Sequence, residues 1–298
     1  MSTHHDGDHY LRPLDGSTPA EHYQRFGWWV SDIIVPPDAL RRVRSLCDQL
    51  DTAERDGPFP DVLREFLAWD GSLPRPPRLN QYFALQYQAV YDLVMTPRIH
   101  EIAAELSGAR TLRIFNTAMI RKSPGDHSRY ATVGVHCDAA YWRTCSSRQM
   151  LTAWVPLQDT SVDMGPIRYY SASHRWPDHP EVRALRDEQN FTATGQERMR
   201  RWLAASGIHD DPVTGAIRAG QVTFHHCLTL HGSGANTSAR TRDGISIHLQ
   251  PGDNRYEQRS ATDEYVHDAF VRRRDGVPDY TDARLCPLTW PVAARGAG

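Results

Sequence analysis

Two residues near the middle of the chain have metal-binding side chains and stand two positions apart. They are His136 and Asp138, in the segment VGVHCDAAYW. The segment is typical of a strand or a strand end, and side chains two apart on a strand leave the same face. An imidazole and a carboxylate in this arrangement can share one cation.

This spacing alone does not identify a metal site. The same pattern occurs at His4 with Asp6 and at His209 with Asp211. The first pair lies in a polar terminus and the second precedes Pro212 in a loop-like stretch, whereas the middle pair has apolar and aromatic neighbours that can line a pocket. A structural interpretation also stays open for the middle pair, with a hydrogen-bonded core histidine and an aspartate that caps a turn.

A second histidine and an arginine follow at a distinctive spacing. In LTLHGSGANTSARTRDGISIHLQ, His231 follows a predicted strand and precedes a Gly/Ser turn, and Arg242 opens the next strand 11 residues later. Arg240 is a competing candidate, because it lies two positions earlier and shares the strand face of Arg242 if the strand begins early.

The order of these residues resembles the phytanoyl-CoA dioxygenase family, which has His-x-Asp, an internal Gly-Pro-like turn, a distal His and an Arg about eleven residues later. The resemblance runs from roughly Gly27 to Gln250. It implies a mainly β chain with peripheral helices, built as a double-stranded β-helix (a cupin-like jelly roll), in which His136, Asp138 and His231 hold iron(II). One turn departs from the family pattern, because Tyr169–His174 reads YYSASH where relatives read like Pro-Gly-Ser-His.

The resemblance also implies 2-oxoglutarate as co-substrate and dioxygen (O2) as oxidant. A site of two histidines and one carboxylate leaves positions on iron(II) for the keto acid of 2-oxoglutarate and for dioxygen. The far carboxylate requires a planar, permanently charged partner, and we expect Arg242 in this role with a hydroxyl from Ser233. Trp154 and Lys122 fall where the family places residues beside the co-substrate. As alternatives, the tryptophan is a core residue and the lysine lies exposed on the surface.

Aromatic residues near the predicted metal site suggest a substrate pocket. We expect Trp142, Tyr141, Tyr170 and His225 to contact the substrate, although such aromatic side chains also suit a core. His225 and His226 are adjacent in a predicted strand and must point to opposite faces, so neither is needed as a metal ligand. A coenzyme A thioester lacks support as substrate, because the sequence has no clustered basic surface for its phosphates.

These assignments predict an oxygenase that oxidises, and by default hydroxylates, a C–H bond of a small natural-product intermediate, with release of succinate and carbon dioxide. Cyclisation, epimerisation or desaturation with the same cofactors are alternatives that depend on substrate placement. Asp138 argues against halogenation, because related halogenases replace this carboxylate with a small residue that admits a halide. Two other classes of function are a zinc-dependent hydrolase, in which Arg242 has no role, and a non-catalytic binding protein.

The elements that position these residues follow from local sequence. Gly27–Val35 is aromatic and β-branched and predicts a strand, and the two prolines after it predict a helix start. Residues 51–78 are typical of a long loop with a short helix, while residues 82–106 and 183–205 predict helices. Further strands are predicted within residues 111–122, 149–158, 165–173, 220–230 and 243–250.

Length and composition fit a small-molecule enzyme. The 298 residues suit a single oxygenase domain, with residues 1–20 as a flexible N-terminal segment. A formal net charge of −2 indicates no nucleic-acid partner, and the lack of a long apolar run indicates no membrane partner. Five scattered cysteines without a CxxC pair predict reduced thiols. The polar start of the chain, without an apolar segment, predicts a cytoplasmic protein, and we expect a monomer or homodimer. Lys122 is the only lysine, and this arginine bias hints at a GC-rich bacterial genome and antibiotic biosynthesis.

Overall fold

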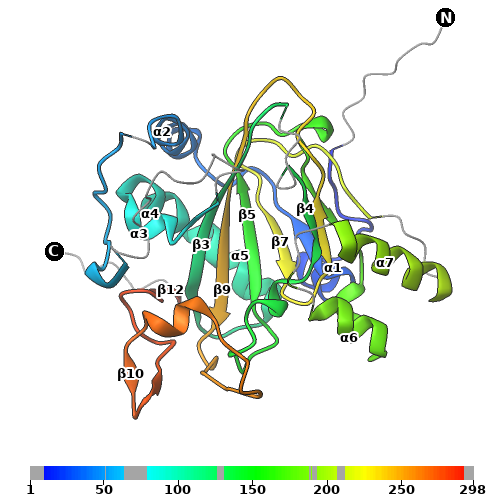
Figure 1. Ribbon diagram of the computed structural model, residues 1–298. Helices are drawn as coiled ribbons and strands as arrows, with labels where there is room; N and C mark the ends of the chain where they lie inside the picture. The colour runs from blue at the N-terminus through cyan, green and yellow to red at the C-terminus, as the bar shows by residue number, and fades with distance from the viewer. Residues whose placement is uncertain are drawn as a thin grey trace, which may run out of the picture.

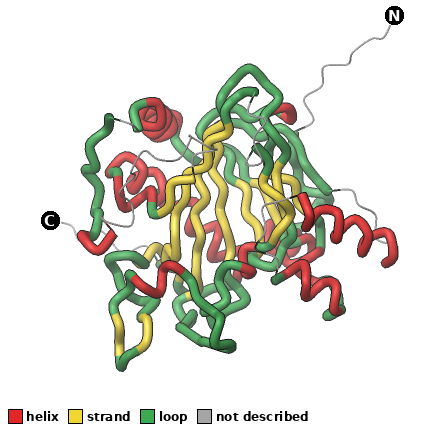
Figure 2. Tube along the Cα trace, viewed as in Figure 1, coloured by secondary structure: helices red, strands yellow, loops and turns green. Residues whose placement is uncertain are grey.

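The structure is a computed structural model that describes residues 10–50, 52–63, 79–125, 131–187, 189, 193–206 and 212–291. Within these residues the chain has a mixed α and β fold, in which a large antiparallel sheet and a smaller one stand at the centre (Figure 1). Helices and long loops surround the two sheets (Figure 2).

Seven described strands form the large sheet. Their order is β1 (Trp28–Val30), β7 (Thr223–His226), β5 (Leu151–Pro156), β9 (Arg242–Pro251), β3 (Leu112–Lys122) and β12 (Leu288–Trp290), and β2 (Leu79–Gln81) also pairs with β3. The smaller sheet has the order β4 (Val133–His136), β8 (His231–Ser233) and β6 (Ile167–Tyr169). A separate pair consists of β10 (Arg273–Arg274) and β11 (Val277–Pro278). Each of these pairings is antiparallel.

Helices cover one face of the large sheet. The core on this face joins strands β5 and β9 to helices α2 (Pro37–Asp48), α3 (Phe83–Gln86), α4 (Gln88–Val94) and α5 (Pro97–Ser107). Helix α1 (Pro19–Phe26) packs on α5, and α6 (Pro180–Arg186) and α7 (Ala193–Ser206) lie beside the smaller sheet (Figure 1). Short 3-10 helices are η1 (Asp61–Leu63), η2 (Asp138–Ala140), η3 (Val162–Met164), η4 (Ser173–Arg175) and η5 (Val266–Ala269).

The two faces of the large sheet differ because side chains alternate along each strand. The helix-covered core receives Leu151, Ala153 and Val155 from β5 and Ile245, Ile247 and Leu249 from β9. The intervening positions, among them Thr152, Trp154 and His248, line a cavity on the opposite face. A bulge between Ile114 and Asn116 on β3 shifts the alternation, so that Asn116 reaches the same cavity.

The predicted strand segments are confirmed, because β3, β5, β6 and β7 lie within them and β9 extends one residue beyond its predicted segment at each end. The predicted strand Gly27–Val35 is shorter, since β1 ends at Val30 and the amides of Ile34 and Val35 instead bind the carbonyl of Gly220. The described chain is mixed rather than mainly β. Its α-helices hold more residues than its strands, because the described segment before β3 forms α1 to α5 and only the two short strands β1 and β2.

Two expectations fall partly outside the described residues. Of the predicted loop at 51–78, residues 52–63 are described and include the short helix η1. Of the predicted flexible segment at 1–20, Tyr10 pairs with Ala216 and Leu11 is buried. No described helix combines the length and the apolar character that a membrane crossing requires.

Gly244→Ala tests the close packing of β9 against β5. A β-carbon at residue 244 would lie 2.6 Å from the buried indole of Trp154. We expect this substitution to lower the free energy of unfolding by about 1–3 kcal/mol, measured by urea denaturation. Gly16→Ala is the control, because an added β-carbon there meets nothing within 4 Å, and it should change stability by less than about 0.5 kcal/mol. Equal stability of the two variants would show that the contact with Trp154 does not restrict residue 244.

Candidate active site

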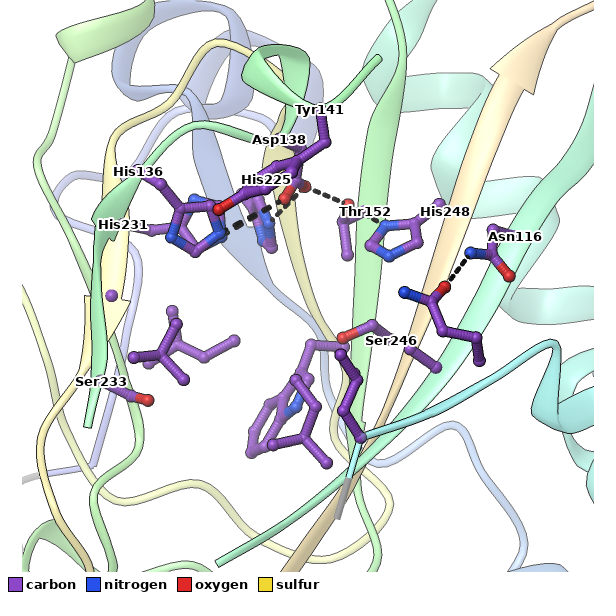
Figure 3. Close-up of a pocket in the computed structure, with 18 of the residues that line it drawn as sticks. Asn116, His136, Asp138, Tyr141, Thr152, His225, His231, Ser233, Ser246 and His248 are labelled. Carbon is purple, nitrogen blue, oxygen red and sulfur yellow. Dashed lines mark hydrogen bonds and ion pairs between the residues drawn. The ribbon is translucent and has the colours of Figure 1, made fainter. Parts of the chain in front are cut away.

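Three metal-binding side chains converge at the end of the smaller sheet. His136 ends β4 and His231 begins β8, and the two residues pair directly across the strands. Asp138 lies beyond the strand, as the first residue of η2. Its Oδ1 atom lies 3.8 Å from His136 Nε2 and 3.6 Å from His231 Nε2. Figure 3 shows the three side chains gathered at one end of the cavity, and one ligand atom from each lies within 4.8 Å of the others, which suits a single cation.

Backbone carbonyls orient both imidazoles. His136 Nδ1 lies 2.8 Å from the carbonyl oxygen of Gly134, and His231 Nδ1 lies 2.9 Å from that of Thr229. A carbonyl only accepts, so each Nδ1 carries the proton and donates it. Each Nε2 atom therefore presents a lone pair toward Asp138, which is the tautomer that a metal ligand requires.

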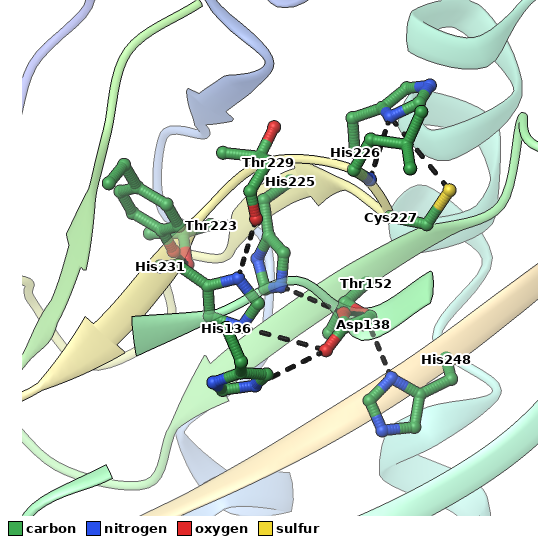
Figure 4. Close-up of polar contacts among 12 residues, drawn as sticks. His136, Asp138, Thr152, Thr223, His225, His226, Cys227, Thr229, His231 and His248 are labelled. Atoms are coloured by element: carbon green, nitrogen blue, oxygen red, sulfur yellow. Dashed lines mark hydrogen bonds and ion pairs between the residues drawn. The ribbon is translucent and has the colours of Figure 1, made fainter. Parts of the chain in front are cut away.

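The two oxygens of the Asp138 carboxylate have separate partners (Figure 4). Oδ2 accepts a hydrogen bond from Thr152 Oγ1 at 2.5 Å and another from His225 Nε2 at 3.2 Å. Oδ1 faces the two imidazoles of His136 and His231. The protein thus occupies one carboxylate oxygen and leaves the other for a cation.

Burial and hydrogen bonding set the protonation states that a metal needs. Burial lowers the pKa of His136 and of His231, so both imidazoles are neutral at neutral pH. Burial alone would raise the pKa of Asp138, but the neighbouring imidazoles and the hydrogen bond from His225 outweigh it and hold the pKa of this carboxyl well below its usual range. Neutral imidazoles and a carboxylate bind a divalent cation without releasing protons.

A buried guanidinium without an acidic partner shares the cavity with this cluster. The cavity has a volume of about 190 Å³, and Arg242, which is 1% exposed, lines it. Arg242 Nη1 donates to the carbonyl of Gly165 at 3.0 Å, its Cζ lies 5.3 Å from the ring centre of Trp154, and its Nε has no hydrogen-bond partner. Burial lowers its pKa to about 10, which still leaves it charged at neutral pH. No carboxylate of the described chain pairs with Arg242, so the site fits an anionic ligand.

The competing arginine lies elsewhere. Arg240 is exposed, and its guanidinium contacts the sulfur of Met164 instead of the cavity. The structure thus places Arg242, and not Arg240, in the cavity that His136, Asp138 and His231 line.

Lys122 is buried rather than exposed on the surface. It pairs with Arg242 across β3 and β9, and its Nζ donates to Ser233 Oγ at 2.7 Å and to the carbonyl of Gly234 at 2.5 Å. Ser233 and Trp154 line the cavity, whereas Lys122 lies behind Ser233. Lys122 therefore contacts the cavity lining through the serine hydroxyl, which it orients.

Three of the four predicted substrate-binding residues line the cavity. These are Tyr141, Trp142 and His225, and His225 lies behind the Asp138 carboxylate. Tyr170 does not line this cavity; it lies beyond the end of β6 and borders a separate hollow with Arg168. As the strand pattern predicts, His226 points away from His225 and lies beside His174, with 5.2 Å between the ring centres.

Several cavity residues were not predicted. Thr152 lies two residues before Trp154 on β5, and Ser246 and His248 lie four and six residues after Arg242 on β9. The alternation of strand side chains could have placed all three in the cavity once Trp154 and Arg242 were assigned to it. Tyr265 comes from a later loop, and no sequence signal connects it with the site.

Thr152→Val tests the support of the carboxylate. The substitution keeps the side-chain volume but removes the hydroxyl that donates to Asp138, so the affinity for manganese(II) should fall about 10–100-fold in isothermal titration calorimetry. Thr152→Ser keeps the hydroxyl and should bind manganese close to the wild type. Unchanged affinity in the valine variant would mean that Asp138 does not depend on Thr152.

Comparisons with known proteins agree with this geometry. A model of the phytanoyl-CoA dioxygenase (PhyH) family matches residues 23–244. The peroxisomal phytanoyl-CoA dioxygenase of Rattus norvegicus is 21% identical over 236 residues, which cover 78% of this chain and 68% of the relative.

Solved structures with the same fold include enzymes from nogalamycin biosynthesis. The non-heme alpha-ketoglutarate-dependent carbocyclase SnoK from nogalamycin biosynthesis is 23% identical with a TM-score of 0.65, covering 94% of this chain and 98% of that one. The epimerase SnoN from the same biosynthesis is 22% identical with a TM-score of 0.64, covering 91% and 96%, and it also has a structure with Fe3+, alpha-ketoglutarate and nogalamycin RO. EctD from S. alaskensis, solved with 2-oxoglutarate and 5-hydroxyectoine, is 17% identical with a TM-score of 0.58, covering 84% of each chain.

The family match spans most of the chain, and two histidines and one carboxylate form a group that can hold a metal ion. The protein therefore belongs to the phytanoyl-CoA dioxygenase family of iron- and 2-oxoglutarate-dependent oxygenases, with His136, Asp138 and His231 as its candidate iron ligands.

Proposed function

We propose that the protein oxidises, and by default hydroxylates, a C–H bond of a small natural-product intermediate. The reaction consumes one dioxygen and one 2-oxoglutarate and releases succinate and carbon dioxide with the hydroxylated product. The observation that carries this proposal is the shared cavity, which is lined both by the buried Arg242, a guanidinium without an ion-pair partner in the described chain, and by His136, Asp138 and His231.

Each side chain has a role that its contacts support. His136 Nε2, His231 Nε2 and Asp138 Oδ1 would hold iron(II), which supplies the reactivity toward dioxygen when bound. Arg242 would bind the far carboxylate of 2-oxoglutarate with its unpartnered Nε and its remaining N–H groups. Ser233, oriented by Lys122, would add a hydroxyl to this carboxylate. We interpret the two antiparallel sheets as the double-stranded β-helix of this family.

A zinc-dependent hydrolase and a non-catalytic binding protein each leave one feature of the site without a role. A zinc-dependent hydrolase uses two histidines, a carboxylate and water, but it has no use for a buried guanidinium that lacks an acid. A non-catalytic binding protein has no need of an Asp138 carboxylate whose second oxygen is held by two donors. Asp138 also fills the position that a halogenase keeps open for a halide.

Cyclisation or epimerisation is a second candidate outcome. SnoK and SnoN, which share the fold, are named as a carbocyclase and an epimerase. EctD, solved with a hydroxylated compound, shares the same fold. The outcome therefore depends on how the substrate lies against the cavity wall, and product mass distinguishes gain of one oxygen from loss of two hydrogens or no change.

Succinate release in the absence of substrate tests the oxygenase class. Purified protein supplied with iron(II), ascorbate and 2-oxoglutarate should release succinate slowly, because the co-substrate site is formed without substrate. N-oxalylglycine, which retains both carboxylates but cannot be decarboxylated, should suppress this release, and His231→Ala or replacement of iron by zinc should abolish it. Release that persists in metal-free protein, or zinc-dependent activity that ignores 2-oxoglutarate, would exclude the proposal.

Arg242→Leu tests the co-substrate role of the buried guanidinium. The Michaelis constant for 2-oxoglutarate should rise about 100-fold, because one charge-assisted bidentate pair is lost. Thermal stability without ligand should change little, because the leucine replaces a charge that no acid neutralises. Arg240→Leu is the matched control and should leave the Michaelis constant unchanged, because Arg240 is exposed outside the cavity. The reverse result would move the co-substrate site to Arg240.

A further inference from the structure

His248 lies on the cavity face of β9, as Arg242 does, and the two residues lie near opposite ends of the strand. Its Nδ1 atom lies 2.8 Å from Thr152 Oγ1. The indole of Trp142 packs edge-on against its ring, with 5.0 Å between the ring centres and 70° between the planes. These two contacts fix the orientation of the imidazole.

The direction of the hydrogen bonds follows from Asp138. A carboxylate only accepts, so Thr152 donates its single hydroxyl proton to Asp138 Oδ2. The oxygen of Thr152 then accepts from His248, which places the imidazole proton on Nδ1. Burial lowers the pKa of His248 to about 4, so the ring is neutral at neutral pH.

The second nitrogen of His248 is consequently an acceptor that faces the cavity. Nε2 carries a lone pair in this tautomer, and no described residue donates to it. Figure 3 shows this nitrogen directed into the cavity, on the side away from Thr152. A neutral ring acceptor in such a place fits a hydroxyl or an N–H group of a bound molecule.

The cavity wall around His248 is uncharged and partly aromatic. Apart from Asp138 and Arg242, none of the described lining residues is an aspartate, glutamate, lysine or arginine. Asn116 Nδ2 donates to Gln81 Oε1 at 2.5 Å, which leaves the amide nitrogen of Gln81 as a donor on the same wall. Trp142 packs against His248, and Ser246 and Tyr265 also line the cavity. This wall does not complement the phosphates of a coenzyme A thioester.

We propose that His248 positions the substrate by accepting, at Nε2, a hydrogen bond from a hydroxyl or N–H group of a neutral, largely aromatic or apolar molecule. The inference rests on the proposed oxygenase function and names the class of its substrate. Because His248 donates to Thr152 and Thr152 donates to Asp138, a molecule held by His248 lies on the same wall as the candidate metal cluster. His248 thereby selects which C–H bond is presented for oxidation.

Two matched probes test the acceptor directly. The probes are 1-naphthol, which has a hydroxyl donor, and 1-methoxynaphthalene, which has none. Their binding is measured by isothermal titration calorimetry on the nickel(II)-loaded protein with N-oxalylglycine, which cannot turn over. The wild type should bind 1-naphthol about fivefold tighter than the ether, the worth of one neutral hydrogen bond.

Two variants of His248 separate its two nitrogens. His248→Asn keeps a donor near the position of Nδ1 for Thr152 but removes the acceptor, so the preference for 1-naphthol should vanish while nickel affinity stays close to the wild type. His248→Gln places an amide oxygen near the position of Nε2, so it should retain most of the preference. A role in structure alone would lower the affinity for both probes equally in both variants.

The outcomes separate this inference from the proposed function. No preference in the wild type, no binding of either probe, or a preference that survives in His248→Asn would overturn the role of His248. The wild-type comparison needs no variant, so poor folding of a variant leaves the inference testable. Iron-dependent release of succinate without substrate tests the oxygenase class separately, because that release does not require a donor bound at His248.

Discussion

The Asp138 carboxylate is the interaction on which the rest of the site depends. Asp138 follows the smaller sheet, while its two donors, Thr152 on β5 and His225 on β7, belong to the large sheet. The hydrogen bonds to Oδ2 therefore join the two sheets at the point where His136 and His231 converge on Oδ1. Without these two hydrogen bonds, the carboxylate could turn both oxygens toward a cation, and the two sheets would lose a contact that holds them at a fixed distance.

Arg242 carries a buried charge that forms no ion pair within the described chain. A buried guanidinium normally pairs with a carboxylate, because an uncompensated buried charge is destabilising. Asp243 is the adjacent acid, but it points to the other face of β9, where it pairs with Arg121 at 2.7 Å. The alternation of side chains along β9 thus puts the ion pair of Asp243 with Arg121 on one face and the guanidinium of Arg242, which forms no ion pair, on the other. In the proposed function, the far carboxylate of 2-oxoglutarate would neutralise Arg242.

Sequence predicted the parts of the site that depend on periodicity and spacing. The strand segments, the pair His136 and Asp138, and the spacing from His231 to Arg242 all rest on local pattern. Patterns of this kind do not show which way the chain turns after a strand ends. Tyr170 was expected in the pocket, but the chain turns after β6 and carries it to a separate hollow.

Other features depended on contacts between distant segments. The burial of Lys122 is set by Ser233 and Gly234, which lie more than a hundred residues away in the chain. The turn that departs from the family pattern contains Ala172, whose φ of 63° is in the left-handed region that favours glycine. The sequence shows an alanine at position 172, where relatives have glycine. The structure shows that the backbone keeps the left-handed conformation with this alanine.

Strand β9 carries two cavity residues of different proposed function, Arg242 near its start and His248 near its end. Residues on one strand face are spaced in steps of two, at about 3.3 Å for each residue, so Arg242 and His248 stand roughly 20 Å apart. The candidate metal cluster lies nearer to His248, to which Thr152 connects it. A co-substrate anchored at Arg242 and a substrate held at His248 would then approach the metal from opposite ends of one rigid strand. The backbone of β9 sets both positions. Changes in the surrounding loops can therefore alter the shape of the substrate pocket without disturbing the proposed co-substrate site.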